Sequence, residues 1–87
     1  MVNGPQIRAA RAFLDWQQHE LANRAGVARK TITDFERELR TPTPRVVADI
    51  VATLEDAGIR FIEEADGKCG IFLDLEAYRI TRGRPPQ

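Results

Sequence analysis

The sequence has very few of the residues that form disulfides and metal sites. Its 87 residues include one cysteine and one histidine. A single cysteine, Cys69, cannot form an internal disulfide, which fits a reducing cytoplasm. One histidine and one cysteine cannot complete a tetrahedral metal site of the usual kind within one chain. We therefore expect a cytoplasmic protein that needs neither a metal nor a cofactor.

Long apolar segments are missing as well. No run approaches the roughly 18 apolar residues of a membrane span, and no apolar run follows the N-terminal charges as in a signal peptide. No nucleophile–base pair or phosphate-binding loop is visible, so nothing indicates an enzyme. We expect one small domain near the lower size limit for independent stability, a limit that an obligate dimer would ease.

The charges balance overall but are unevenly distributed. The chain has 13 basic and 13 acidic residues. Residues 1–45 carry eight basic and five acidic residues, a net charge of +3, whereas residues 46–78 carry two basic and eight acidic residues, −6. Residues 79–87 add three arginines and no acid. This asymmetry is typical of a surface that faces nucleic acid, with a solvated acidic surface behind it.

Residues 18–37, QHELANRAGVARKTITDFER, predict two short helices joined by a tight turn. Ala22 is small enough for two steeply crossing helices to approach each other. Gly26 can adopt the positive φ that such a turn often needs. The inward-facing positions at helical spacing are Leu21, Ala25, Val27, Ile32 and Phe35. Together these features are the signature of a helix-turn-helix.

The same stretch and its surroundings resemble a known family, the phage repressor and Cro type of helix-turn-helix regulators, also called the XRE family. The similarity covers roughly residues 6–54. The residues that carry it are Gln18, Leu21-Ala22, Ala25-Gly26-Val27, Ile32, Phe35-Glu36-Arg37 and Arg40-Thr41-Pro42.

The resemblance implies a four-helix, repressor-like domain; with the short C-terminal β-hairpin that the later residues predict, the expected fold class is mainly α. The resemblance also implies a structural ion pair between Arg11 and Glu36. One departure is that Glu38 stands where the family commonly has the glycine that ends the second helix of the motif. A non-glycine residue in that left-handed turn costs on the order of 1 kcal/mol, so we expect a locally altered helix end instead.

The remaining elements follow from caps and periodicity. The first helix should begin after Asn3, which with Gln6 can form a capping box, and run to about Leu14. The second should begin near Gln17. The third should span Ala28 to Glu38, and the fourth should start at Thr43-Pro44 and stop at Gly58.

From Ile59 the period changes, and Ile59–Glu64 and Ile71–Leu75 predict a hairpin around Asp66-Gly67. The predicted division of the chain is therefore a DNA-binding domain over 1–58, a hairpin over 59–80 and a basic tail over 81–87.

The third helix predicts the DNA-reading surface. Because Ile32 and Phe35 face inward, the opposite side can enter a major groove. The candidates for base contacts are Arg29, Lys30, Thr33 and Asp34. The candidates for backbone contacts are Gln18, Thr31, Arg37, Arg40 and Arg45. Asp34 is the unusual member, since an acid near phosphates is costly unless it accepts a hydrogen bond from a cytosine amine or pairs with Arg37 or Lys30.

A lone hairpin is marginal in water, so this one must pack on the helices or pair with that of a second copy. We favour the second arrangement, because the apolar residues exceed what one small core can hide. Those residues are Phe61, Ile62, Phe72, Leu73 and Tyr78. In the tail, Arg82-Gly83-Arg84-Pro85 resembles the core of an AT-hook that follows a minor groove; the alternative is a solubilising tail.

These features predict a sequence-specific, double-stranded DNA-binding transcriptional regulator. The leading hypothesis is a repressor that acts as a homodimer on a pseudo-palindromic operator. The alternative is an antitoxin-like module that neutralises a partner protein and regulates its own synthesis through DNA binding. Purification alone as a dimer, or only together with a second protein, would distinguish the two.

Overall fold

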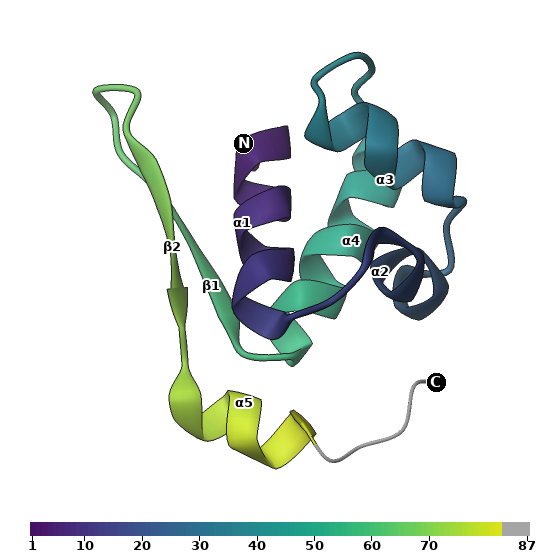
Figure 1. Ribbon diagram of the computed structural model, residues 1–87. Helices are drawn as coiled ribbons and strands as arrows, with labels where there is room; N and C mark the ends of the chain where they lie inside the picture. Colours follow the sequence, from purple (N-terminus) through teal and green to yellow (C-terminus); the bar gives the residue numbers. More distant parts are fainter. Residues whose placement is uncertain (83–87) are drawn as a thin grey trace.

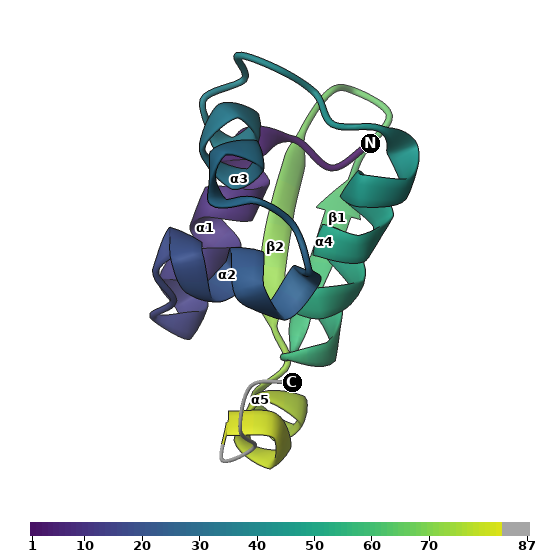
Figure 2. The ribbon, with the colours of Figure 1, turned by 90° about the vertical axis from the view of Figure 1, so that its right-hand side faces the viewer.

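A computed structural model describes residues 1–82. Helices α1–α4 form a bundle, and the hairpin packs on α1 and α4 (Figure 1). The view of Figure 2 places α2 and α3 in front and the hairpin behind them. The elements are α1 (Gly4–Leu14), α2 (Gln18–Ala25), α3 (Arg29–Glu36), α4 (Pro44–Asp56), β1 (Ile59–Glu63), β2 (Cys69–Leu73) and α5 (Leu75–Arg82). The fold is mainly α with one short antiparallel hairpin, as the sequence predicts.

Side-chain caps set the starts of α1 and α4. The Gln6 backbone N–H donates to Asn3 Oδ1 at 3.0 Å, and the Asn3 backbone N–H donates to Gln6 Oε1 at 2.9 Å. This reciprocal pair is the predicted capping box of α1. At α4, the Val46 N–H donates to the Thr43 hydroxyl, and Pro44 occupies the first turn. Both predicted starts are confirmed.

One buried apolar cluster joins the two helices of the motif to α1, α4 and β1. Gly26 ends α2 with φ 71°, the left-handed conformation predicted for the turn. Ala22 is 2% exposed where α2 meets the other helices. The largest fully buried side chains are Ile7, Leu21, Ile32, Ile50, Leu54 and Ile59. Since Ile32 lies in this cluster, α3 is anchored by its inner face and turns its outer face to solvent.

The end of α3 corrects one prediction. The helix ends at Glu36 rather than Glu38, and the expectation of an altered helix end is wrong, because Glu38 adopts the left-handed conformation with φ 58°. The Glu38 N–H donates to Phe35 O at 3.0 Å, and the Leu39 N–H donates to Asp34 O at 2.9 Å. These two bonds are those of a Schellman motif, which satisfies carbonyls left open at the helix end. The turn therefore persists with glutamate in the place of glycine.

The hairpin is fastened to the helices through one of its faces. Its register pairs Ile59 with Leu73 and Phe61 with Ile71, and these side chains pack on the core. Gln6, which is 3% exposed, donates through Nε2 to the carbonyls of the opposed strand residues 62 and 70, at 3.2 and 3.1 Å. Of the two arrangements considered for the hairpin, packing on the chain's own helices is therefore present.

Helix α5 was not predicted. The sequence suggested a hairpin through residue 80 and a tail from 81, but β2 ends at Leu73 and α5 follows at once. Asp74 starts this helix, since its carboxylate accepts from the Ala77 N–H at 3.1 Å, and its own N–H donates to Gly58 O at 2.7 Å. A Cβ at Gly58 would lie 3.0 Å from the Asp74 carbonyl oxygen and from the Tyr78 nitrogen, so glycine permits this close approach.

The AT-hook-like segment Arg82-Gly83-Arg84-Pro85 lies outside the described residues, apart from the backbone of Arg82. Within residues 1–82, none of the helices has the length and apolarity to span a bilayer.

The strained turn after α3 leads to a stability prediction. Replacing Glu38 by glycine should raise the free energy of unfolding by roughly 0.5–1 kcal/mol, because the relieved left-handed strain exceeds the extra chain entropy of glycine. Urea unfolding measures the change. Glu38→Ala is the matched control: it removes the same carboxylate but keeps the strain, so it should not stabilise. Equal effects of the two variants would contradict a backbone origin.

Candidate nucleic-acid interface

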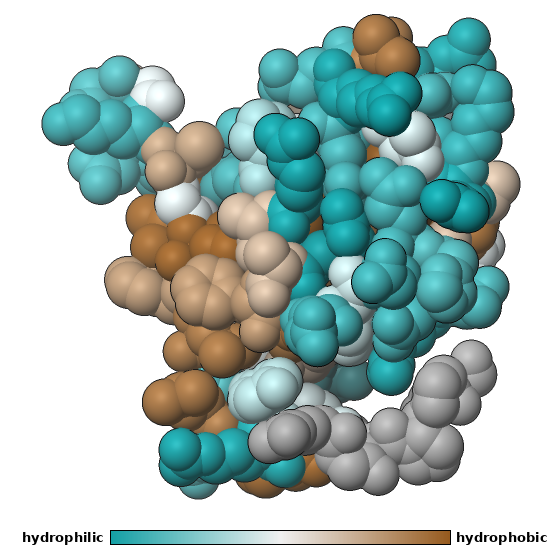
Figure 3. Space-filling view, viewed as in Figure 1, coloured by the Kyte–Doolittle hydropathy of each residue, from teal (hydrophilic) through white to brown (hydrophobic). Residues whose placement is uncertain are grey.

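The outer face of α3 carries the polar side chains predicted to meet bases. Arg29 and Lys30 are exposed, whereas Thr33 and Asp34 are half-buried. Figure 3 shows a mostly hydrophilic surface over α2 and α3, while apolar surface gathers on the side of the hairpin. The molecule thus has a polar face carried by the motif and an apolar face carried by its C-terminal part.

A buried ion pair holds α3 in place. Arg11 Nε lies 2.5 Å from Glu36 Oε2, and Arg11 Nη2 lies 2.7 Å from Glu36 Oε1, so the contact is bidentate. The Glu36 side chain is only 2% exposed. The hydrogen bond to Glu36 raises the pKa of the Arg11 guanidinium above its ordinary value. Arg11 Nη1 also donates to the Trp16 carbonyl at 2.9 Å, so the pair connects α1, the α1–α2 loop and the end of α3.

Gln18 extends this network to α2. Its Nε2 donates to Glu36 Oε1 at 3.1 Å, and its Oε1 accepts from the Thr33 hydroxyl at 2.9 Å. Gln18 was predicted to contact the DNA backbone, but in the free protein its amide is engaged within the motif. The Thr33 hydroxyl also contacts the Arg29 carbonyl at 3.2 Å, so the group that Thr33 leaves for a base is its methyl.

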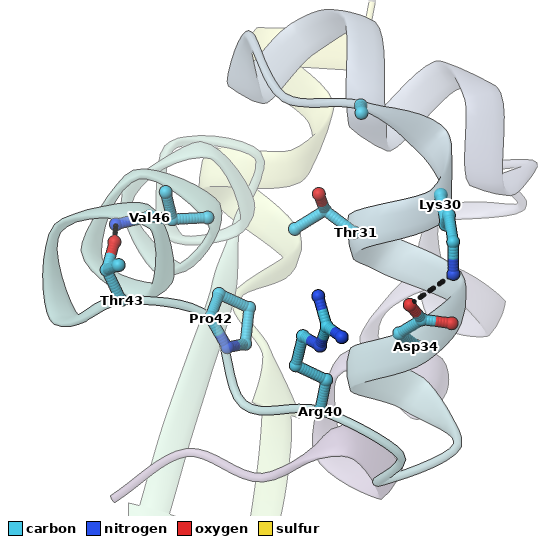
Figure 4. A pocket seen from close by; sticks show the side chains of 8 residues that line it. Lys30, Thr31, Asp34, Arg40, Pro42, Thr43 and Val46 are labelled. Carbon is cyan, nitrogen blue, oxygen red and sulfur yellow. Dashed lines mark hydrogen bonds and ion pairs between the residues drawn. The ribbon is translucent and has the colours of Figure 1, made fainter.

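Lys30 and Asp34 form an ion pair one helical turn apart. Lys30 Nζ lies 2.8 Å from Asp34 Oδ2, and the Lys30 side chain is 82% exposed (Figure 4). Of the partners considered for Asp34, the free protein uses Lys30. The Asp34 side chain is 17% exposed, so only the lysine end of the pair is in solvent. Helical pairs at this spacing contribute about 0.3–0.5 kcal/mol, so Lys30 can leave Asp34 when a better acceptor is offered.

A hollow of about 340 Å³ lies between α3 and the loop that leads to α4. In Figure 4 the Arg40 guanidinium points toward Thr31 in the middle of the view, with Pro42 on one side and the Lys30–Asp34 pair on the other. Thr31 and Arg40, both predicted to meet the DNA backbone, are thus brought together with the Lys30–Asp34 pair. The other three predicted backbone residues, Gln18, Arg37 and Arg45, do not line the hollow, and Arg37 and Arg45 are exposed.

The sequence missed part of this surface. Pro42, Thr43 and Val46 line the hollow without having been predicted as site residues. Their place in the sequence could have indicated them, since they lie shortly after Arg40, in the loop and the first turn of α4. Among residues 1–82, no group of three or more histidine, cysteine or acidic side chains could hold a metal ion.

A short helix that is anchored inward by its apolar face, and that presents basic and polar groups beside a second helix, defines a DNA-binding helix-turn-helix domain. A family model described as helix-turn-helix matches residues 7–55, more than half of the chain. The chain therefore belongs to this family, as an XRE-type DNA-binding transcriptional regulator. The family is one of regulators and not of enzymes. No curated protein matches the sequence.

The buried network predicts an unequal pair of stability changes. Glu36→Ala leaves the Arg11 guanidinium without its partner and should lower the free energy of unfolding by about 3 kcal/mol. Asp34→Ala is the matched control, since it removes a carboxylate from the same helix but breaks a pair with an exposed lysine, and it should cost less than about 1 kcal/mol. Urea unfolding of both variants measures the difference, and losses of similar size would contradict the structural role of Glu36.

Proposed function

We propose that this regulator is a sequence-specific repressor that binds a pseudo-palindromic operator as a homodimer. The observation that carries the proposal is the exposed basic start of α3 on a helix whose inner face is fixed by Ile32 and Glu36. Arg29 and Lys30 have the length and the donors to reach guanine O6 and N7 in a major groove. Repression then requires no chemistry, because an occupied operator excludes other proteins from the promoter.

The half-buried residues of α3 give the proposed base contacts their selectivity. The Thr33 methyl packs on a thymine methyl, because the Thr33 hydroxyl is engaged with Gln18. Asp34 accepts from a cytosine amine once Lys30 has moved to a base. An acid at this place disfavours DNA that offers it only phosphates or acceptors.

Contacts to the DNA backbone would fix the register of α3 in the groove. Arg40 and Thr31, which face the same hollow, are placed to meet one phosphate, and Arg37 and Arg45 meet others. At the start of α2, Gln18 stands where the helix N-terminus presents free N–H groups to an anion. These contacts carry affinity and the dependence on salt, but no sequence information.

The homodimer is supported by the dimensions and surface of the chain. The fold measures 33 × 29 × 20 Å along its principal axes. These extents are comparable to one turn of DNA, about 34–36 Å, so two copies side by side are of a size to reach two successive half-sites. The apolar side of the molecule lies away from α2 and α3, so a partner there leaves the DNA-reading face free (Figure 3).

A second candidate function is the antitoxin-like module. The observation in its favour is that Phe72, Leu75 and Ile80 are 62%, 52% and 60% exposed on β2 and α5. An apolar surface of this kind can receive a different protein. Purification decides between the two candidates: a dimer obtained alone supports the repressor, and recovery only with a second protein supports the antitoxin.

The proposed function is tested by selecting bound sequences from a random pool of duplex DNA. The wild type should enrich an inverted repeat whose halves lie about one helical turn apart. Lys30→Ala should lose the preference at one position of each half-site and cost about 1–3 kcal/mol on the wild-type site, because a base contact is removed. A wild type that enriches no sequence would contradict the proposal.

Arg40→Ala is the matched control for Lys30→Ala, since it also removes one positive charge beside the same hollow. It should weaken binding to all sequences equally and reduce the slope of affinity against salt by about 1. If Lys30→Ala behaves in the same way as Arg40→Ala, Lys30 contacts phosphate and does not read bases.

A further inference from the structure

The outer face of the hairpin is apolar and is not covered by the described part of the chain. In an antiparallel pair, directly opposed residues share one face. Since Ile59, Leu73, Phe61 and Ile71 pack inward, the outward face consists of two pairs, Arg60 with Phe72 and Ile62 with Gly70. Phe72 is 62% exposed, which is unusual for a large aromatic side chain.

Gly70 contributes no side chain to this face, and we call its position the notch. A Cβ added at Gly70 would meet no atom within 4 Å, so no packing inside the chain requires a glycine there. Its conformation does not require one either, since Gly70 is not among the glycines with positive φ. Glycine also weakens a strand, because it has no side chain to pack against its neighbours. Within one chain, neither packing nor backbone conformation therefore requires a glycine at position 70.

The Phe72 ring, which we call the knob, and the notch at Gly70 lie on the same face of β2. Phe72 and Gly70 are two residues apart on β2, so their side-chain directions are parallel. A two-fold contact needs a self-complementary surface, in which one residue meets a second and the second meets the first. Phe72 of one copy can cover Gly70 of the other, while the second Phe72 covers the first Gly70.

We propose that the outer face of the hairpin is the homodimer interface, and that each Phe72 ring occupies the Gly70 notch of the other copy beside Ile62. The inference rests on the proposed homodimer and names its surface. It leaves α2 and α3 free, because the hairpin lies on the far side of the helices from them (Figure 2).

The charges of this face suit a second copy. Arg60 is the only charged residue among the four outward ones, and its Nη2 lies 3.6 Å from Asp74 Oδ2. Each Arg60 therefore brings its own counter-charge, so two such faces can meet without opposing unpaired like charges. A different protein would need only a pocket for Phe72, and the notch at Gly70 would stay unexplained. A second copy of the chain explains both, because its own Phe72 ring occupies the notch.

The test exchanges the knob and the notch. Phe72→Ala leaves the contact without a ring, and Gly70→Phe sets ring against ring, so each single variant should raise the dimer dissociation constant at least about tenfold. The double variant again places one ring opposite one small residue and should recover most of the lost affinity. Sedimentation equilibrium without DNA measures all of them.

Leu39→Ala is the matched control, because Leu39 is 70% exposed but lies in the loop after α3. It should leave dimerisation unchanged. Far-UV circular dichroism and thermal unfolding of each monomeric variant verify that it folds; Gly70→Phe points into open space and should fold normally. A monomeric wild type, single variants that remain dimeric, or a double variant no better than the single ones would each overturn the proposal.

The interface and the proposed function can fail separately. A monomeric Phe72→Ala protein that still selects one half-site would show that base reading stands without the interface. A wild type that dimerises through this face but enriches no DNA sequence would keep the interface and remove the sequence-specific function.

Discussion

The structure depends on one buried carboxylate. Glu36 stands at the end of α3 and receives two hydrogen bonds from Arg11 and one from Gln18. A carboxylate that is 2% exposed is stable only when it is fully paired, so its three donors fix the positions of the elements that carry them. Through this residue α1, α2 and α3 are held in one arrangement, and the exposed side chains of α3 acquire defined positions relative to the start of α2.

A second buried polar side chain, Gln6, fixes the hairpin on the other side of α1. Gln6 performs for the hairpin what Glu36 performs for α3, since it is buried and joins α1 to both strands through their carbonyls. Both polar anchors therefore lie on or against α1, which stands between the DNA-reading helix and the hairpin (Figure 1). In the proposed homodimer, α1 would connect the contact at the hairpin with the recognition helix on its other side.

Much of this arrangement was predictable, because its signals are local. The caps at Asn3 and Thr43, the turn at Gly26 and the inward spacing of Ile32 and Phe35 each follow from neighbouring residues. Helix α5 was missed although its start has a local signal, since the Asp74 carboxylate accepts from the Ala77 N–H. What the sequence does not show is the distant contact that stops β2 there, in which the Asp74 N–H is bonded to Gly58 O.

The persistence of the left-handed turn at Glu38 was missed for a different reason, because the bonds that close this turn are local. Local propensity disfavours it, but the closing bonds from the Glu38 and Leu39 N–H groups, together with the packing of Phe35, hold the helix end in place.

The outward face of α3 is the surface proposed to meet DNA. Chemical-shift mapping of the backbone amides during titration with a selected duplex tests this proposal most directly. If α3 enters the groove, the largest shifts should lie at the start of α2 and along residues 29–34, with the hairpin unchanged. Shifts concentrated on the hairpin and α5, with α3 unaffected, would contradict it.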